Sequence, residues 1–406
     1  MAISKVTLER AQEWCRWDPN ERTANCLQDL LNRTDEHAHA QLTTLFPPDG
    51  SRIGFGTAGL RAAMDIGPLR MNDLVIVQTA QGIARYCQQQ HSDKEKLRVV
   101  IGYDHRSNPE LALSSLSFAI LSTLVFETAG IDCVLLDGLV ATPLIPFATT
   151  RLGAAVGIMV TASHNPKEDD GYKVYWSDGC QIRPPVDKGI ADSILENLTP
   201  WTDYRLLLAS RKGKDSLGLS NPAMTHDLRS QYFDAIQQSG LVSGQVGLCP
   251  FTDIRPPTFC YTAMHGVGRS FAQEGFIRFG LPPFLSVPQQ EEPDPEFPTV
   301  SFPNPEEKGA LDMAKAHAEE HGCDVVLAND PDADRLAVAE RSRETGEWAV
   351  FTGDQIGALL GSWLWEIVGK KSDEVKRGDG GGRRCLANPN CNSFSHARFC
   401  LFVFSQ

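Results

Sequence analysis

Apolar residues recur at two different spacings in the first half of the chain. Residues 1–45 and Asp73–Gln90 place them at helical spacing, which predicts amphipathic helices. Solid apolar runs then alternate with helical stretches: the predicted strands are Val99–Tyr103, Cys133–Leu136 and Ala154–Val160, and the predicted helices are Pro109–Thr128 and Thr142–Leu152. This order predicts an α/β fold with a mixed, largely parallel sheet that helices cover on both faces.

The alternation is interrupted and then resumes. Tyr172–Trp176 alternates as an exposed strand does, Asp187–Leu198 predicts a short helix, and Thr199–Pro222 has little periodicity. A second βα unit is predicted after this break, with helices Asp227–Gln238 and Leu311–His321 and strands Thr258–Thr262 and Asp324–Ala328. The Pro-rich stretch Leu281–Gly309 interrupts that unit, and we expect it to be a linker or a functional loop.

These patterns predict a division of the chain into four parts. Residues 1–205 form a first domain and residues 206–345 a second. Residues 346–376, with a strand at Trp348–Phe351 and a helix at Asp354–Val368, begin a third domain. Residues 377–406 form a low-complexity tail that contains Gly380–Gly382.

Composition and charge limit which partners and which cellular compartment we expect for this protein. The 406 residues are 42% hydrophobic and 22% charged, as in a soluble globular protein. The formal net charge of -13 argues against nucleic acid or an anionic membrane as a main partner. The apolar run Leu111–Phe126 is too short to span a membrane, and Met1–Lys5 leads into a charged rather than an apolar stretch. We expect a reduced, cytoplasmic protein.

A small hydroxyl side chain is carried past the end of a predicted buried strand. Ala154–Val160 leads directly into Thr161–Pro166, where Asn165-Pro166 enforces a turn beside Ser163. Ligands gather where the carboxyl ends of such strands meet loops. Ser163 is therefore a candidate nucleophile. The alternative is that it only begins a turn, as Ser commonly does.

Three carboxylates stand at alternate positions after another predicted strand. They are Asp330, Asp332 and Asp334. Carboxylates this close repel one another unless a cation holds them, and hard oxygen ligands favour Mg²⁺ or Ca²⁺. An EF-hand loop would need a glycine and a glutamate where this chain has Arg335 and Arg341, so that interpretation fails. We expect Mg²⁺ shared with a phosphate oxygen; the alternative is a solvated acidic turn.

Further polar side chains could complete a site around Ser163. The candidates are Arg61, which ends the glycine-spaced loop Phe55–Arg61, His164, Lys173 and Arg335. A serine can carry a phosphoryl group when a metal and cations neutralise the developing charge and a base takes the proton. Lysine can serve as that base if burial removes its charge. Taken singly, each candidate could equally be a surface charge or a turn-stabilising side chain. The turn Met264–Gly268 is a weaker candidate for a phosphate cradle.

These motifs resemble those of the α-D-phosphohexomutase family. Thr161–Pro166 with Gly171–Lys173 is similar to the family's phosphoserine loop, Asp330–Arg335 to its metal loop and Phe55–Arg61 to its N-terminal active-site loop. The resemblance runs from about residue 10 to about residue 368. It implies repeated mixed-sheet βα domains of the phosphohexomutase type. It also implies an intramolecular phosphotransferase that interconverts sugar 1-phosphates with the 5- or 6-phosphates of glucose, ribose or deoxyribose.

The resemblance also implies a role for each candidate residue. Ser163, carried as phosphoserine, would pass its phosphoryl group to a sugar phosphate and be recharged from the bisphosphate intermediate. The implied Mg²⁺ ligands are the Ser163 phosphate, Asp330, Asp332 and Asp334. Arg61 and Arg335 would flank the phosphate, and Lys173 would be the general base. His164, beside the serine, is a further candidate catalytic residue. Glucose 1,6-bisphosphate would prime the serine. The expected partners are small sugar phosphates, with a monomer favoured.

The chain departs from the family pattern after about Val368. The family has four domains, of which the third supplies a sugar-binding loop with paired glutamates and the fourth a loop that grips the non-reacting phosphate. Neither motif occurs here, so we expect a C-terminally truncated chain whose third domain is only begun and whose fourth is absent. Remote binding groups orient the substrate. The alternatives are therefore a catalytically weak phosphosugar-binding fragment, or a glucose 1,6-bisphosphate synthase that differs in its phosphoryl donor.

Overall fold

The computed structural model describes residues 3–92, 96–211, 219–239 and 257–377. By its internal contacts the chain divides into two compact units, Met1–Leu228 and Arg229–Gln406. The finer division predicted from the sequence, with boundaries after residues 205, 345 and 376, stays a prediction. Residues 378–406 of the predicted tail lie outside the described residues.

Three short helices open the first unit: α1 Lys5–Trp17, α2 Glu21–Asn32 and α3 Glu36–Leu45. Each begins after a polar residue whose side chain accepts a hydrogen bond from a backbone N–H of the first turn, namely Ser4, Asn20 and Asp35. Their apolar faces meet one another and the larger core, with Trp14 packed edge-on against Phe46. The helical prediction for residues 1–45 is confirmed.

The first unit is built on a five-stranded mixed sheet in the order β1-β7-β6-β2-β5. The strands are β1 Leu60–Ala63, β7 Asp169–Trp176, β6 Val156–Val160, β2 Arg98–Tyr103 and β5 Asp132–Leu135. Strand β2 pairs in parallel with both β5 and β6, whereas β7 runs antiparallel to β6 and β1. The prediction for Tyr172–Trp176 is wrong in one respect: the strand is buried rather than exposed, because its side chains pack into the core and β1 covers its outer edge. A short ribbon of β3 Ser107–Asn108 and β4 Leu113–Ser114 lies apart from this sheet.

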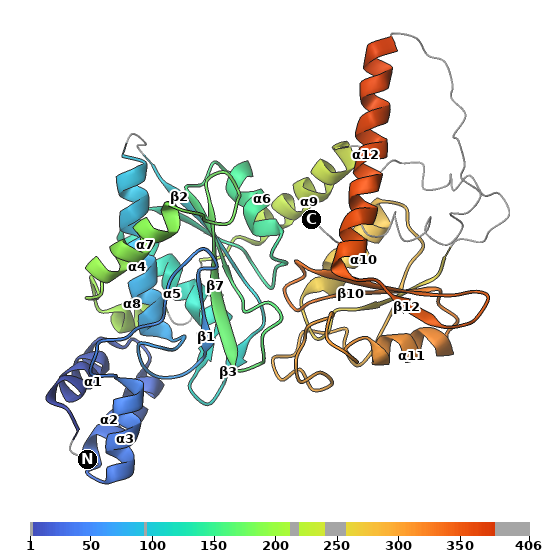
Figure 1. Cartoon of the computed structure of the whole chain (residues 1–406). Helices are drawn as coiled ribbons and strands as arrows, with labels where there is room; N and C mark the ends of the chain where they lie inside the picture. The colour runs from blue at the N-terminus through green and yellow to red at the C-terminus, as the bar shows by residue number, and fades with distance from the viewer. Residues whose placement is uncertain (1–2, 93–95, 212–218, 240–256, 378–406) are drawn as a thin grey trace. The chain divides into compact units, whose positions relative to one another are not determined.

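Helices cover both faces of this sheet (Figure 1). One face packs with α4 Asp73–Gln90, α5 Ser115–Thr128 and α7 Val186–Glu196 in a large apolar core, and α8 Tyr204–Arg211 contacts α5. The other face packs against α6 Leu144–Arg151, where Gly157 leaves room for Thr149. Helix α5 begins at Ser115 rather than at the predicted Pro109, because Ser114 and Ser117 form a reciprocal capping box there.

The second unit repeats this layered plan with a sheet in the order β12-β11-β10-β8-β9. Its strands are β12 Trp348–Val350, β11 Leu336–Arg341, β10 Val325–Asn329, β8 Phe259–Thr262 and β9 Leu285–Ser286. Helices α10 Gly268–Arg278 and α12 Gly353–Arg377 pack on one face and α11 Asp312–Glu320 on the other. Helix α9 Pro222–Gln238 reaches α10, where Arg229 pairs with Glu274 at 2.6 Å. Strand β12 pairs with β11, so the segment expected to open a third domain supplies an edge strand of this sheet.

The predicted fold class is confirmed as α/β with repeated mixed-sheet βα units. Among the residues that the structure describes, no helix combines the length and the apolar character needed to cross a membrane.

Candidate active site

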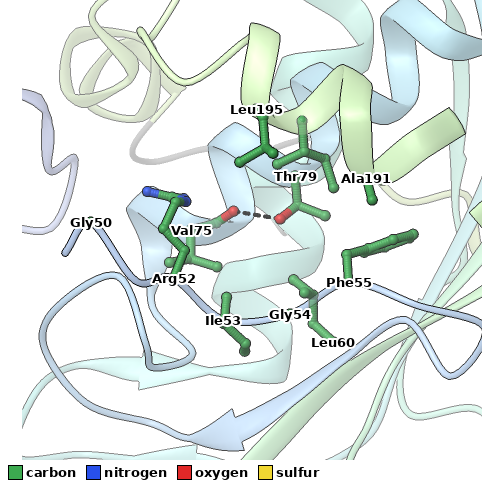
Figure 2. A pocket seen from close by; sticks show the side chains of 11 residues that line it. Gly50, Arg52, Ile53, Gly54, Phe55, Leu60, Val75, Thr79, Ala191 and Leu195 are labelled. Atoms are coloured by element: carbon green, nitrogen blue, oxygen red, sulfur yellow. Dashed lines mark hydrogen bonds between the residues drawn. The ribbon is translucent and has the colours of Figure 1, made fainter. Parts of the chain in front are cut away.

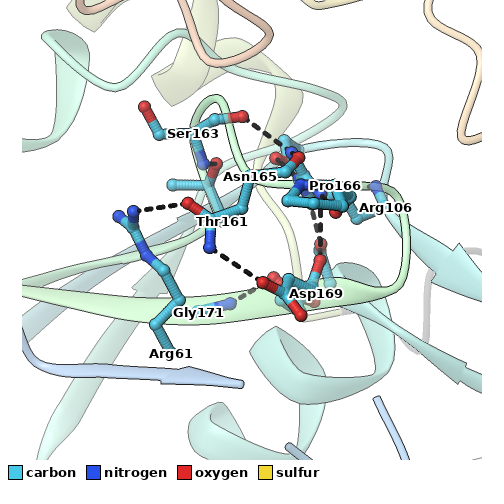
Figure 3. Close-up of polar contacts among 11 residues, drawn as sticks. Arg61, Arg106, Thr161, Ser163, Asn165, Pro166, Asp169 and Gly171 are labelled. Atoms are coloured by element: carbon cyan, nitrogen blue, oxygen red, sulfur yellow. Dashed lines mark hydrogen bonds and ion pairs between the residues drawn. The ribbon is translucent and has the colours of Figure 1, made fainter. Parts of the chain in front are cut away.

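Ser163 lies where β6 ends, in the turn that the sequence predicts. Its backbone has a φ of +54°, a conformation that L side chains rarely adopt. The Ser163 N–H donates to the Thr161 hydroxyl at 2.9 Å, which fixes the turn from within. Figure 3 shows the Ser163 hydroxyl pointing away from the side of the loop where Arg106 lies. A strained, internally bonded turn thus presents one hydroxyl at the carboxyl end of a central strand.

The buried guanidinium of Arg106 organises this turn. Its Nη2 donates to the carbonyl oxygens of Ser163 and Asn165, both at 2.7 Å. Its Nη1 donates to those of Pro166 at 2.7 Å and Asp169 at 2.9 Å. These four bonds hold the loop at both ends (Figure 3). Sequence reasoning missed Arg106, although it follows β2 in the same way that Ser163 follows β6.

Two buried carboxyl groups stand behind Arg106. Asp104 Oδ2 lies 3.5 Å from Arg106 Nε, and both side chains are fully buried. Ser115 Oγ lies 2.6 Å from Asp104 Oδ1 and 3.0 Å from Asp170 Oδ2. Burial and the neighbouring Asp104 raise the pKa of Asp170 well above its ordinary value. Because the Ser115 hydroxyl carries a single hydrogen, a protonated Asp170 that donates to Ser115 Oγ leaves that hydrogen for Asp104 Oδ1.

Arg61 and Lys173 lie on one face of the sheet beside this turn. Arg61 pairs in register with Gly171, two residues before Lys173 on β7, so their side chains are diagonal neighbours on the same face. Arg61 Nη1 donates to Asn165 Oδ1 at 2.9 Å, which ties it to the serine loop. Lys173 is 8% exposed. His164 is half-buried in the loop itself. Ser163, His164, Arg61 and Lys173 are thus gathered in one unit.

Glycines make this close approach of chain segments possible. A Cβ at Gly59 would lie 1.9 Å from the Tyr172 carbonyl oxygen, and the φ of Gly59 is +73°. A Cβ at Gly171 would lie 2.5 Å from the Thr161 carbonyl oxygen. The Phe55–Arg61 loop can therefore approach β7, and β7 can approach the serine turn, only with glycine at these two places.

A pocket of 310 Å³ lies beside the Phe55–Arg61 loop, but none of the predicted catalytic or binding residues lines it. Its walls come from Gly50, Arg52–Phe55 and Leu60 and from helices α4 and α7 (Figure 2). Arg52 reaches from this wall to donate to Gln78, and burial together with the nearby Arg10 lowers the pKa of Arg52 to about 10. The lining is mostly apolar and contains none of the predicted site residues.

In the second unit, the three predicted carboxylates follow β10. One oxygen each of Asp330, Asp332 and Asp334 lies within 4.8 Å of the others, and Asp330 and Asp332 are fully buried. Arg335 ends the loop. Its backbone N–H donates to Asp330 Oδ1 at 2.9 Å, and its side-chain Nε lies 3.9 Å from Asp330 Oδ2. Hard, convergent carboxylate oxygens are the donor set that Mg²⁺ prefers, so these residues fit that ion.

The turn Met264–Gly268 packs against this carboxylate loop. It follows β8, the parallel neighbour of β10, and the Val267 N–H donates to the Pro331 carbonyl oxygen at 2.8 Å. A Cβ at Gly266 would lie 2.3 Å from Pro331 Cα. His265, 2% exposed, shares a 2.7 Å hydrogen bond through Nε2 with Thr299, which fastens the long Pro-rich segment to the turn. The turn supports the carboxylate loop.

Comparison with known proteins decides the family. Residues 52–200 match the profile of phosphoglucomutase/phosphomannomutase α/β/α domain I, and residues 230–344 match that of domain II. The chain belongs to the phosphoglucomutase/phosphomannomutase family. The family resemblance read from the sequence is confirmed, and the two matched segments cover the serine loop and the carboxylate loop in turn.

Named relatives place the chain within this family. It is 43% identical to human phosphopentomutase over 378 residues, which is 91% of this chain and 58% of that protein. It is 38% identical to human glucose 1,6-bisphosphate synthase over 375 residues, 90% of this chain and 56% of that protein. A putative phosphomannomutase from Thermus thermophilus superposes with a TM-score of 0.59 at 25% identity, covering 78% of this chain and 62% of that one. The chain thus spans under two thirds of the length of these relatives.

Proposed function

We propose that the chain carries the phosphoryl-transfer part of a sugar-phosphate mutase, an isomerase that interconverts sugar 1-phosphates and 5- or 6-phosphates. One observation carries this proposal. The Ser163 hydroxyl leaves a strained turn at the end of β6, and Arg106 binds four carbonyl oxygens of that turn. A nucleophile held this firmly needs little reorganisation before it reacts. The similarity to phosphopentomutase supports the substrate class.

The proposed reaction has two transfers. In the first, the bond between phosphorus and Ser163 Oγ of phosphoserine breaks while a new bond forms to a hydroxyl oxygen of the sugar phosphate. Lys173, when neutral, takes the proton that the sugar hydroxyl loses. In the second, the other phosphoryl group of the resulting bisphosphate returns to Ser163 Oγ, and the freed sugar oxygen regains the proton. Arg61, tied to the serine loop through Asn165, would bind the transferring phosphoryl oxygens.

The proposed metal site is the carboxylate loop. Asp330, Asp332 and Asp334 would hold Mg²⁺ together with an oxygen of the Ser163 phosphate. Mg²⁺ bound there would offset the negative charge of the phosphoryl group. Arg335, whose guanidinium lies 3.9 Å from Asp330, would add a positive charge. His164 adjoins the nucleophile and would orient the incoming sugar phosphate.

The proposed cycle needs a bisphosphate to prime the serine, and glucose 1,6-bisphosphate is our candidate. The proposed partners are small sugar phosphates, the proposed compartment is the cytoplasm, and a monomer is favoured. A second function is synthesis of glucose 1,6-bisphosphate, and the 38% identity to such a synthase favours it. In that case Ser163 would play the same part, but the bisphosphate would leave as the product.

Phosphorus NMR separates these functions. Ribose 1-phosphate or glucose 1-phosphate is incubated with the chain, Mg²⁺ and a catalytic amount of glucose 1,6-bisphosphate. A mutase produces the 5- or 6-phosphate while the bisphosphate level stays constant, and Ser163→Ala abolishes this conversion. Net accumulation of bisphosphate from an added phosphoryl donor would favour the synthase. Equal conversion by the wild type and Ser163→Ala would contradict the proposal.

A further inference from the structure

A second group of metal-binding side chains lies at the end of α11, on a different element from the carboxylate loop. His317, Glu320 and His321 each offer a ligand atom, and these atoms lie within 4.8 Å of one another. The spacing explains this, because residues three and four apart share one face of a helix. His317 is half-buried, and Glu320 and His321 are exposed. Two of the three side chains are therefore open to solvent.

The ring nitrogens are arranged for ligation. The two imidazole rings lie with centroids 4.3 Å apart. His321 Nδ1 lies 2.9 Å from the His317 carbonyl oxygen, and only a protonated Nδ1 can donate there. That tautomer leaves the lone pair on Nε2, and a carbonyl behind the other ring nitrogen is the usual support of a metal-bound histidine. His317 Nε2 is covered, yet it has no hydrogen-bond partner within the described part of the chain.

The charges around the cluster also favour a cation. His321 follows the last turn of α11, where the helix dipole places partial negative charge. Glu319 and Glu320 add carboxylates; Glu319 Oε1 accepts a 2.7 Å hydrogen bond from Trp348 Nε1. Lys315, a basic residue of the same helix, is paired with Asp312 at 2.7 Å, which reduces its repulsion of a bound cation.

We propose that His317, Glu320 and His321 form a surface site for a late first-row divalent cation such as Zn²⁺, with water completing the coordination. Two imidazoles and one carboxylate are a donor set that suits Zn²⁺ and that Mg²⁺ does not prefer. The site is independent of the proposed phosphoryl transfer. A bound ion would link the last turn of α11 to the residue that follows it, and so protect that turn from opening.

Calorimetric titration of the untagged chain with Zn²⁺ in excess Mg²⁺ tests the site, because the Mg²⁺ occupies carboxylate sites without competing for imidazole. His317→Ala and His321→Ala should each weaken one binding event by at least about 10-fold, the lower end of the loss seen when only outer-shell partners of a metal are changed. Glu320→Gln should weaken it less. His37→Ala, which changes an exposed histidine of α3, is the matched control and should change nothing.

Two further readouts keep the test decisive. Zn²⁺ should slow amide exchange in the last turn of α11 in the wild type and not in His321→Ala. Binding should weaken as the pH falls, because protons compete with the metal for the imidazole nitrogens. Unchanged Zn²⁺ affinity and stoichiometry in both histidine variants would overturn the proposal, and so would an equal loss in His37→Ala.

Discussion

Arg106 Nη2 donates a 2.7 Å hydrogen bond to the backbone carbonyl oxygen of Ser163. The bond joins the ends of two parallel strands, since Arg106 follows β2 and Ser163 follows β6. Backbone carbonyl oxygens are present in any sequence, so the contact depends on the arginine and on the path of the loop. The position of the candidate nucleophile is thus set by a side chain that takes no part in the proposed chemistry.

Replacing Arg106 should impair both the loop and the stability of the first unit. Arg106→Met leaves four carbonyl oxygens without their donor and Asp104 without its cation. Breaking a buried ion pair in this way costs about 3–5 kcal/mol. Chemical denaturation should show this loss. In Arg106→Met with Asp104→Asn, stability should partly recover while phosphorylation of Ser163 stays slow; recovery of both would show that Arg106 does not position the loop.

Gly59 and Gly56 offer a matched pair of substitutions in one loop. An added Cβ at Gly59 would collide with the Tyr172 carbonyl oxygen, whereas at Gly56 it would meet nothing within 4 Å. Gly59→Ala should therefore lower the melting temperature and slow phosphoryl transfer, with a stability loss of about 1–3 kcal/mol from backbone strain alone. Gly56→Ala should have little effect on stability. Similar melting temperatures for the two variants would contradict this account of the loop.

The carboxylate loop should bind divalent cations through Asp332. Asp332→Asn removes one charged oxygen ligand from a set of three, so Mg²⁺ affinity measured by calorimetry should fall by about 10-fold or more. Glu344→Gln, which neutralises an exposed carboxylate of the same unit, is the control and should leave the affinity unchanged. Equal affinities for all three proteins would place the ion elsewhere.

The stability of the first unit should fall as the pH rises. Burial and the nearby Asp18 raise the pKa of Asp73 to about 8, above the ordinary value of about 4. Between these two values the folded state holds a proton that the unfolded state has released, so rising pH favours unfolding. Asp73 should contribute up to about 1.4 kcal/mol per pH unit to this slope, and the raised pKa of Asp170 adds to it. Denaturation between about pH 5 and about pH 8 should show this slope, and Asp73→Asn should reduce it by the share of Asp73. A slope that stays unchanged in Asp73→Asn would contradict this assignment.

Local signals predicted much of the fold. Helix α4 has the predicted bounds because Asn72 caps its first turn and apolar residues recur through its length. Strand β1 was missed because Leu60–Ala63 is only four residues long and follows a glycine-rich loop. Its partner β7 was consequently predicted to be exposed, since alternation along one strand cannot reveal a neighbour that is distant in sequence.

The residues of the candidate site were predicted where the side-chain type itself indicates a chemical role. Ser163 and the three aspartates follow strand ends, and their residue types suggest nucleophile and ligands. Arg106 could not be found in this way, because its partners are backbone carbonyl oxygens more than fifty residues away, as the bond to Ser163 with a separation of 57 illustrates. The raised pKa of Asp170 likewise depends on burial that only the folded chain creates.

The most direct test of the central claim is the intact mass of the chain after exposure to glucose 1,6-bisphosphate and Mg²⁺. If Ser163 is the phosphoryl carrier, the wild type gains the mass of one phosphoryl group, peptide mapping places it on Ser163, and Ser163→Ala gains none. Equal labelling of the wild type and Ser163→Ala would contradict the account.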